Sequence, residues 1–244
     1  MRRFFVQPEL LREGAATLGD ELSRHLAVLR LAAGSTILLT DGRGQEAIAT
    51  IEAVTAAGAA VTIGPLRPAA AVPPLAITIY QGMPKGDKLD EILQKATELG
   101  VARLVPFIAE RSVSRPESDR IDRKRQRWEK IVQEAARQSG RSGVPTVGFA
   151  NSLAAAVAGE QSELRIILWE EERQQGLRQL LAAPGQPESV AVIVGPEGGL
   201  TGAEVAVARA AGFVPVSLGR RILRTETAGP AMAAILQFQL GDIG

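Results

Sequence analysis

Residue types that commonly build disulfides and metal sites are scarce in this sequence. Its 244 residues include no cysteine and one histidine, His25. The absence of cysteine excludes disulfides and thiolate metal sites, and a single histidine disfavours a histidine-rich metal site. We therefore expect a metal-free, cytoplasmic protein. A lone histidine in an amphipathic segment is more often a packing or capping residue, so we assign His25 no chemistry.

An excess of charge of one sign is also missing. The 28 Lys and Arg residues nearly balance 27 Asp and Glu residues, which leaves a net charge of +1. No global field therefore attracts this protein to nucleic acid, and such a role must depend on local basic patches.

Long hydrophobic runs are missing too. Pro8, Glu9 and Arg12 interrupt MRRFFVQPELLREG before a signal-peptide core can form, and no run has the length of a membrane helix.

Two stretches of different texture are separated by GPLRPAAAVPPL, residues 64–75, whose four prolines oppose regular backbone hydrogen bonding. We interpret this segment as a linker between domains at residues 1–70 and 74–244. Before it, STILLTDG and AAVTIG predict short strands, and DELSRHLAVLRL predicts a helical insert. The first domain is therefore expected to be small and rich in β-structure.

After the linker, predicted strands alternate with predicted helices. LAITIY, ARLVPF, RIILW, SVAVIV and VPVSL are typical of buried strands, while KLDEILQKATELG and IDRKRQRWEKIVQEAARQSG have the periodicity of amphipathic helices. This alternation favours an α/β domain with a parallel sheet that is covered on both faces. In open sheets of this kind, ligands bind beyond the carboxyl ends of the strands.

Three of these predicted strands end in distinctive loops: RIILW in Glu170-Glu171, SVAVIV in GPEGG (195–199), and VPVSL in GRRILRTET (219–227). If the strands are neighbours, the loops converge on one pocket. Its backbone groups, aliphatic side chains and threonine hydroxyls suit an uncharged heterocycle with a ribose better than a triphosphate. By itself, GPEGG is equally a tight turn that binds nothing.

The start of the next helix is marked by Thr201, a predicted N-cap with Glu204 at the capping-box spacing. The glycine-rich loop before it matches neither the dinucleotide-binding fingerprint nor the P-loop. No run of acidic residues indicates magnesium.

The strings VGPEGGLTGAEV and LGRRILRTETAGPAM resemble the cofactor-binding end of the SPOUT-superfamily RNA methyltransferases. More narrowly, they resemble the ribosomal RNA small-subunit methyltransferase E family, which methylates N3 of a uridine in bacterial 16S rRNA. Supporting matches run along nearly the whole chain: HLAVLRLAAG, DGRG, KGDKLDEILQKATELGV and QEAARQSGR. Each string alone is weak, but their order and spacing together are specific.

The resemblance implies a PUA-like, RNA-binding β-barrel at residues 1–70 and a SPOUT α/β methyltransferase domain with a deep trefoil knot at residues 74–244. It also implies a homodimer, S-adenosylmethionine as the methyl donor, and small-subunit rRNA as the partner. We expect the protein to bind this rRNA in the assembled subunit. The residues expected to hold the cofactor are Leu168, Trp169, Glu170, Gly195, Pro196, Glu197, Gly198, Gly199, Leu218, Gly219, Ile222, Leu223, Arg224, Thr225, Thr227 and Ala228.

Methylation at N3 poses a chemical problem, because uracil N3 carries a proton and is a poor nucleophile until that proton leaves. Arg224 is the candidate cation, since a guanidinium can donate two hydrogen bonds to an anionic uracil edge or hold the adjacent phosphate. Glu226 and Glu197 are candidate bases. Each could equally order its own loop by accepting backbone N–H bonds.

The candidate RNA contacts are Arg2, Arg3, Arg30, Arg111, Arg115, Gln138 and Arg141. Gln138 and Arg141 would reach RNA if the end of their helix borders the pocket, and otherwise they only end that helix, where a basic side chain meets the dipole. In RSVSRPESDRIDRKRQRW, Glu117, Asp119 and Asp122 dilute the basic residues that phosphate neutralisation needs. Scattered surface arginines are the alternative explanation for the N-terminal candidates.

The last predicted helix, AGPAMAAILQFQL (228–240), is apolar nearly all round. Such a helix must be covered, and we expect a second subunit to cover it, the alternative being burial within one subunit.

Three other functions compete with the uracil-N3 methyltransferase. They are a ribose 2′-O-methyltransferase of the same superfamily, a non-catalytic RNA-binding factor, and a Rossmann-type nucleotide-binding protein, whose fingerprint is missing.

Overall fold

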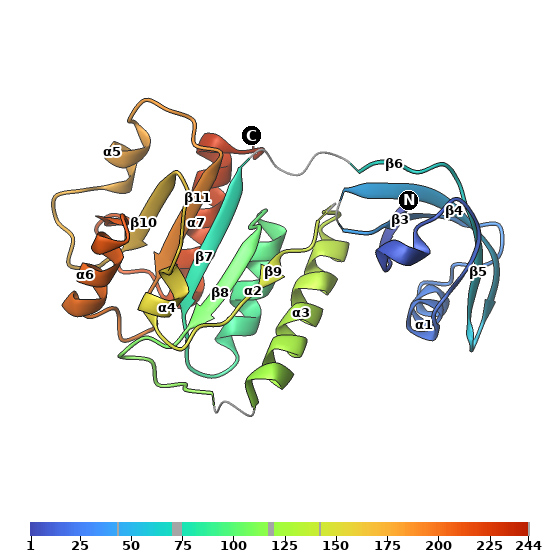
Figure 1. Ribbon diagram of the computed structural model, residues 1–244, viewed down its shortest axis with the longest axis horizontal. Coiled ribbons are helices and arrows are strands. Elements are labelled where there is room, and N and C mark those ends of the chain that lie inside the picture. Colours follow the sequence, from blue (N-terminus) through green and yellow to red (C-terminus); the bar gives the residue numbers. More distant parts are fainter. Residues whose placement is uncertain (43, 70–74, 117–119, 142, 244) are drawn as a thin grey trace. The chain divides into compact units, whose positions relative to one another are not determined.

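The computed structural model describes residues 1–42, 44–69, 75–116, 120–141 and 143–243 (Figure 1). The chain forms two compact units, Met1–Val72 with Ala136–Val144, and Pro73–Ala135 with Pro145–Gly244. Part of the predicted linker, 70–74, lies outside the described residues, as do Glu117 and Asp119. The rest of the linker is more regular than expected, because Arg67–Pro68 forms strand β6, which pairs with another strand.

The first unit is built around one mostly antiparallel sheet in the order β1-β3-β4-β5-β2, with β6 paired to β4. Only β1 and β3 run parallel among these pairs. Besides β6, the strands are β1 (Arg2–Phe5), β2 (Gly14–Leu18), β3 (Thr36–Thr40), β4 (Gln45–Thr55) and β5 (Gly58–Ile63). A short 3-10 helix, η1 (Pro8–Leu10), precedes β2, and the predicted helical insert is α1 (Asp20–Val28). The predicted β-rich first domain is therefore confirmed.

The second unit has a six-stranded sheet in the order β12-β10-β11-β7-β8-β9, and all of its pairs are parallel. This confirms the parallel α/β sheet that the alternation of elements predicts. The strands are β7 (Ala76–Gly82), β8 (Arg103–Phe107), β9 (Thr146–Val147), β10 (Leu164–Leu168), β11 (Ser189–Val194) and β12 (Val214–Val216). The short β9 is an addition, since its two residues give too little pattern for prediction.

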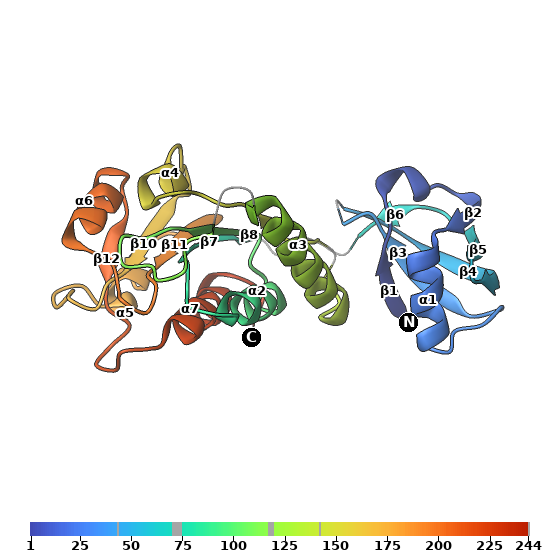
Figure 2. The ribbon, with the colours of Figure 1, turned by 90° about the horizontal axis from the view of Figure 1, so that it is seen from below.

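Helices cover both faces of this sheet (Figure 2). Helices α2 and α7 pack together on one face, whereas α4 and α6 lie on the other. The helices are α2 (Lys88–Glu98), α3 (Ile121–Gln138), α4 (Leu153–Val157), α5 (Leu177–Leu181), α6 (Gly202–Ala210) and α7 (Thr225–Leu240). In α2, the predicted inward face is buried at Leu89, Ile92, Leu93 and Ala96. The trefoil knot stays a prediction, because strand order alone does not define how the chain threads.

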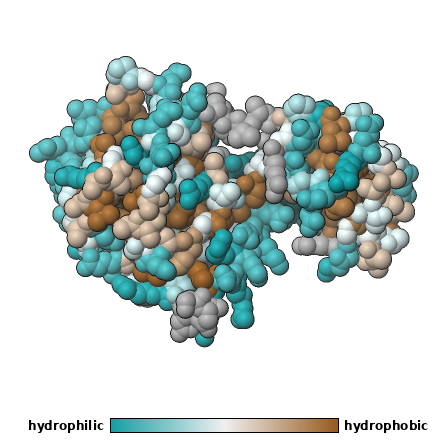
Figure 3. All heavy atoms as spheres, viewed as in Figure 1, coloured by the Kyte–Doolittle hydropathy of each residue, from teal (hydrophilic) through white to brown (hydrophobic). Residues whose placement is uncertain are grey.

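On the face shown in Figure 3, hydrophobic residues appear in small groups between hydrophilic ones. Among the described helices, none is both long and apolar enough to cross a membrane.

The last helix is only partly covered within the single chain. Met232, Ala233 and Leu236 of α7 are buried, but Phe238 is 71% exposed and Ile235 is 39% exposed within the single chain. The polar Gln237 is fully buried instead. One face of α7 therefore packs on the sheet, and the opposite face leaves large apolar side chains in contact with solvent.

Candidate functional site

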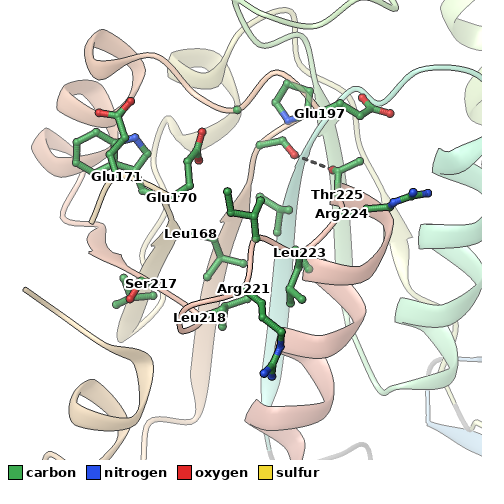
Figure 4. A pocket seen from close by; sticks show the side chains of 18 of the residues that line it. Leu168, Glu170, Glu171, Glu197, Ser217, Leu218, Arg221, Leu223, Arg224 and Thr225 are labelled. Carbon is green, nitrogen blue, oxygen red and sulfur yellow. Dashed lines mark hydrogen bonds between the residues drawn. The ribbon is translucent and has the colours of Figure 1, made fainter. Parts of the chain in front are cut away.

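The three distinctive loops converge on one cavity, because β12, β10 and β11 are neighbours in the sheet. The cavity has a volume of about 720 Å³ and lies at the carboxyl ends of these strands (Figure 4). Of the residues expected to hold a cofactor, all but Thr227 line it. Glu171, Arg220 and Arg221 also line it and belong to the loops that the sequence predicted. The sequence did not assign the other lining residues to the cavity; they are Lys88, Arg173, Val194, Val216 and Ser217.

Glycine is required in the loops that form the cavity. Gly199 has φ +71° and Gly219 has φ +110°, a region that side chains other than glycine rarely adopt. A Cβ on Gly199 would also stand 2.2 Å from a carboxylate oxygen of Glu170. On Gly195, a Cβ would stand 3.1 Å from the side chain of Leu200. The loop backbone is therefore closely packed against its neighbours and exposes peptide groups to the cavity.

The capping box predicted for α6 is present. Glu204 N donates to Thr201 Oγ1 at 3.3 Å, and Thr201 N donates to Glu204 Oε2 at 2.9 Å. The second oxygen of Glu204 accepts a 2.9 Å hydrogen bond from Glu110 N, in the loop that follows β8. One carboxylate thus fixes the start of α6 and ties it to a second loop beside the glycines.

A buried network joins the glycine-rich loop to the start of α7. Thr225 Oγ1 donates to the carbonyl of Gly195 at 2.7 Å, which Figure 4 marks, and Gln81 Nε2 donates to Thr225 Oγ1 at 2.9 Å. Gln81 is 1% exposed and Thr225 is 5% exposed. The Thr225 hydroxyl, predicted to serve the cofactor, is therefore already used in holding two cavity loops together.

Four charged side chains meet at one side of the cavity. Lys88 Nζ lies 3.0 Å from Glu197 Oε1 and 3.2 Å from Glu226 Oε2, and Arg224 Nη1 lies 3.9 Å from Glu226 Oε1. The carboxylate of Glu197 and the carboxylate of Glu226 thus both pair with Lys88, which lies at the start of α2. The sequence gave no indication of this lysine, because it follows a fourth strand, β7, whose loop showed no distinctive chemistry.

The ion pairs change the protonation of these groups. Hydrogen bonds to Glu197 and Glu226 raise the pKa of Lys88. Burial acts to raise the pKa of Glu197, but the hydrogen bonds from Lys88 and from backbone N–H groups outweigh burial, and its pKa is lowered. The pKa of Glu226 is lowered as well, first by its own backbone N–H and further by Lys88. Both carboxylates are therefore charged at neutral pH and are weakened as bases.

The aromatic and aliphatic lining is uneven. Trp169 packs against the core cluster beneath the cavity, and the guanidinium of Arg209 lies 5.9 Å from the centre of its ring. Figure 4 shows Leu168, Leu218 and Leu223 on the inner side of the loops. Ile222, in contrast, is 86% exposed at the outer edge. It borders the cavity but buries little of its own side chain.

The candidate RNA contacts fall into separate places. Arg111 donates to the carbonyl of Gly198 at 3.2 Å, so it lies beside the glycine-rich loop, whereas Arg115 donates to the carbonyl of Glu110 at 2.8 Å in its own segment. Gln138 and Arg141 do not line the cavity, and their segment, Ala136–Val144, packs with the first unit.

The N-terminal arginines differ from one another. Arg3 pairs with the buried Glu46 at 3.2 Å and donates to the carbonyl of Gly140, so it has a structural role. Arg2 is exposed, and Arg30 has φ +55° just after α1. His25 packs edge-on against Phe4, with 5.8 Å between ring centres, as expected of a packing residue.

The residues around the cavity fit a nucleoside better than a metal or a triphosphate. Its volume is in the usual range for small-molecule sites, and it offers aliphatic walls, carboxylates and backbone groups held open by positive-φ glycines. Among the described residues, no group of three His, Cys, Asp or Glu side chains could hold a metal ion. A cofactor that combines a heterocycle, a ribose and a charged amino-acid tail matches this set of groups.

Comparison with known proteins gives independent evidence. An RNA methyltransferase domain profile matches residues 72–237, and an RNA methyltransferase PUA domain profile matches residues 18–63. The chain is 33% identical to the ribosomal RNA small subunit methyltransferase E of Bacillus subtilis (strain 168), over 98% of this chain and 97% of the relative. It is 34% identical to the protein of the same name from Synechocystis, over 93% of this chain and 74% of the relative.

A solved structure is similar along its full length. The crystal structure of a ribosomal RNA small subunit methyltransferase E from Neisseria gonorrhoeae, bound to S-adenosyl methionine, superimposes with a TM-score of 0.89 at 36% identity and covers 100% of both chains. The resemblance that the sequence motifs indicate is therefore confirmed over both units, and the chain belongs to the ribosomal RNA small subunit methyltransferase E family.

Proposed function

We propose that this protein transfers a methyl group from S-adenosylmethionine to N3 of a uracil in 16S rRNA of the small ribosomal subunit. The observation that carries the proposal is a nucleoside-sized cavity bordered by Arg224, whose side chain is 83% exposed. The family relatives support the reaction class, because they are named as ribosomal RNA small subunit methyltransferases. The Neisseria relative supports the cofactor, since it binds S-adenosyl methionine.

The cofactor would be held by the three loops that line the cavity. Peptide groups of 195–199 and 218–219 would bind its polar edges, and Leu168, Leu218 and Leu223 would pack against its ring. When bound, S-adenosylmethionine supplies an electrophilic methyl group on a sulfonium. The protein's part is to align the acceptor with that group, so most of the catalysis comes from positioning and electrostatics.

Arg224 would bind the acceptor base. Its guanidinium extends away from Leu168 and Leu218 in Figure 4, at the outer edge of the cavity. A guanidinium that donates to an anionic uracil edge favours transfer of the N3 proton to solvent water, which leaves the imide anion as the nucleophile. We assign Glu197 and Glu226 to ordering their loops, because their lowered pKa values make them poor bases.

The RNA would be held by basic side chains around the cavity and by the first unit. Arg220 and Arg221 are exposed in the same loop as Arg224, and Arg111 contacts the carbonyl of Gly198 in the glycine-rich loop. Positive charges at these positions neutralise phosphates without a high net charge on the chain. We also propose that the active form is a cytoplasmic homodimer and that the assembled subunit, rather than free rRNA, is the substrate.

The proposal is tested by mass mapping of small-subunit rRNA from cells that lack the protein, and by methylation of that rRNA in isolated subunits and as free RNA. We expect a single N3-methyluridine to be lost in the cells and restored only in the subunits by the purified protein. A missing 2′-O-methyl group, which blocks alkaline cleavage of the next phosphodiester, would identify the ribose methyltransferase instead. Unchanged rRNA, together with no binding of S-adenosylhomocysteine in calorimetry, would identify a non-catalytic factor.

A further inference from the structure

Glu226 lies between two cations at the start of α7. Its Oε2 atom is 3.2 Å from Lys88 Nζ, and its Oε1 atom is 3.9 Å from Arg224 Nη1. The shorter distance is a close ion pair, whereas the longer one is at the limit of such a contact. In this arrangement Glu226 forms its close ion pair with Lys88, and its contact with Arg224 is weak.

Burial explains why Glu226 needs a cation. Its side chain is 14% exposed, and its buried Oε2 atom lies 3.2 Å from Lys88 Nζ. A buried carboxylate without compensation is costly, so Glu226 will take the nearest available positive charge. Lys88 supplies that charge, and its position is fixed by a second carboxylate, Glu197, at 3.0 Å.

Glu197 is itself held in place. Both of its carboxylate oxygens accept from Lys85 N, at 3.2 Å each. Lys88 is therefore anchored to the glycine-rich loop on one side and reaches Glu226 on the other. Figure 4 shows Glu197 and Arg224 extending to the same side of the cavity. Removal of Lys88 would leave Arg224, 3.9 Å away, as the cation next to Glu226.

Arg224 has the freedom to respond. Its side chain is 83% exposed, and its one ion pair with a described residue is the 3.9 Å contact to Glu226. If the Arg224 guanidinium moved about 1 Å toward Glu226, the contact would become a charge-assisted hydrogen bond of ordinary length. A guanidinium can also pair with a carboxylate through two such bonds. A guanidinium captured in this way offers fewer donors to any other anion.

We infer that Lys88 is a positioning residue: it occupies Glu226 and so keeps the Arg224 guanidinium free for the acceptor base. The inference rests on the proposed role of Arg224 in binding uracil. It assigns Lys88 no contact with the reacting atoms. Its effect on methyl transfer passes through Glu226 and Arg224.

The test compares Lys88→Met with three partner variants. Lys88→Arg keeps the positive charge, and Lys88→Met with Glu226→Gln removes the carboxylate that would capture Arg224. Lys95→Met is the matched control, because Lys95 lies on the same helix and pairs with Glu91, at the outer surface. We expect kcat for methyl transfer to fall about tenfold or more in Lys88→Met, to recover most of that loss in Lys88→Arg and in the double variant, and to stay within about twofold of the wild type in Lys95→Met.

Affinity for S-adenosylhomocysteine should change less than about twofold in Lys88→Met, because the defect concerns the acceptor base. A double variant as inactive as Lys88→Met alone would overturn the inference, and so would an equal loss of cofactor affinity. Either outcome would mean that Lys88 serves the cavity directly.

A measurement without substrate separates this inference from the proposed function. In the protein alone, NMR of arginine side chains follows rotation of the Arg224 guanidinium. We expect rotation to slow in Lys88→Met and to recover in the double variant. Unchanged rotation in Lys88→Met would refute the inference even if the wild type methylates rRNA. Slowed rotation would support it even if the acceptor proves to be another base.

Discussion

Gly199 is constrained both by its backbone conformation and by a neighbouring side chain. It has φ +71°, and a Cβ would stand 2.2 Å from Glu170. We expect Gly199→Ala to cost about 1–2 kcal/mol of stability and to weaken S-adenosylhomocysteine binding about tenfold, since a residue with a Cβ is strained at this positive φ and the Glu170 carboxylate must move away. Calorimetry and chemical unfolding measure both. The control is Gly202→Ala, where a Cβ meets nothing within 4 Å. Normal affinity in Gly199→Ala would contradict the assignment of the cavity.

Arg224 illustrates how one exposed side chain can serve the reaction without holding the fold. We expect Arg224→Ala to lower methyl transfer by roughly a hundredfold while changing cofactor affinity little, because its partner is the acceptor base in its activated state. Raising the pH should restore part of the rate, since uracil then loses its N3 proton unaided. Single-turnover rates across pH provide the measurement. A flat pH profile would remove imide stabilisation from the mechanism.

The junction between α2 and α7 is the element whose stability should depend on pH. The pKa of Glu226 is lowered from its ordinary value of 4.5, by its own backbone N–H and by Lys88. A carboxylate with a lowered pKa in the folded state stabilises the fold above its unfolded pKa, and loses this effect as the pH falls through the folded value. Wild type should thus be more stable than Glu226→Gln at pH 7, by a margin that shrinks below about pH 4.5.

Urea unfolding of both proteins between pH 7 and pH 3 measures that margin. Glu91→Gln is a suitable control, because Glu91 is half-exposed in its pair with Lys95, and exposed ion pairs contribute little to stability. A margin that stays constant over this range would show that the ion pairs of Glu226 do not stabilise the junction.

At the scale of the whole molecule, the exposed face of α7 is the proposed site of dimerisation. Phe238 is 71% exposed and Ile235 is 39% exposed, on the same side of the helix. We expect Phe238→Glu to give a monomer with greatly reduced methyl transfer, because a buried charge would oppose the interface. Val207→Glu on α6, where Val207 is 40% exposed, is the control. Light scattering and activity on the same samples decide, and a fully active monomer would end the dimer hypothesis.

Local patterns were sufficient for much of the fold. The period of apolar residues identified α2 and α3, the β-branched runs identified β7, β8, β10, β11 and β12, and the spacing of Thr201 and Glu204 identified a capping box. Each of these features depends on residues close together in the chain, so the local sequence is enough to predict it. The convergence of the three loops was predicted only on the condition that their strands are neighbours, and the strand order β12-β10-β11 meets that condition.

The remaining features depend on strand order and on long-range packing, which only the tertiary structure decides. Lys88 reaches the cavity because β7 lies next to β11, so the start of α2 meets Glu197 and Glu226 from distant parts of the chain. Thr225 turns its hydroxyl to Gly195 for the same reason. The sequence by itself thus determined the elements, the loops and the family. The tertiary structure decided which charges neutralise one another, because Coulomb interactions depend on distance in space and not along the chain.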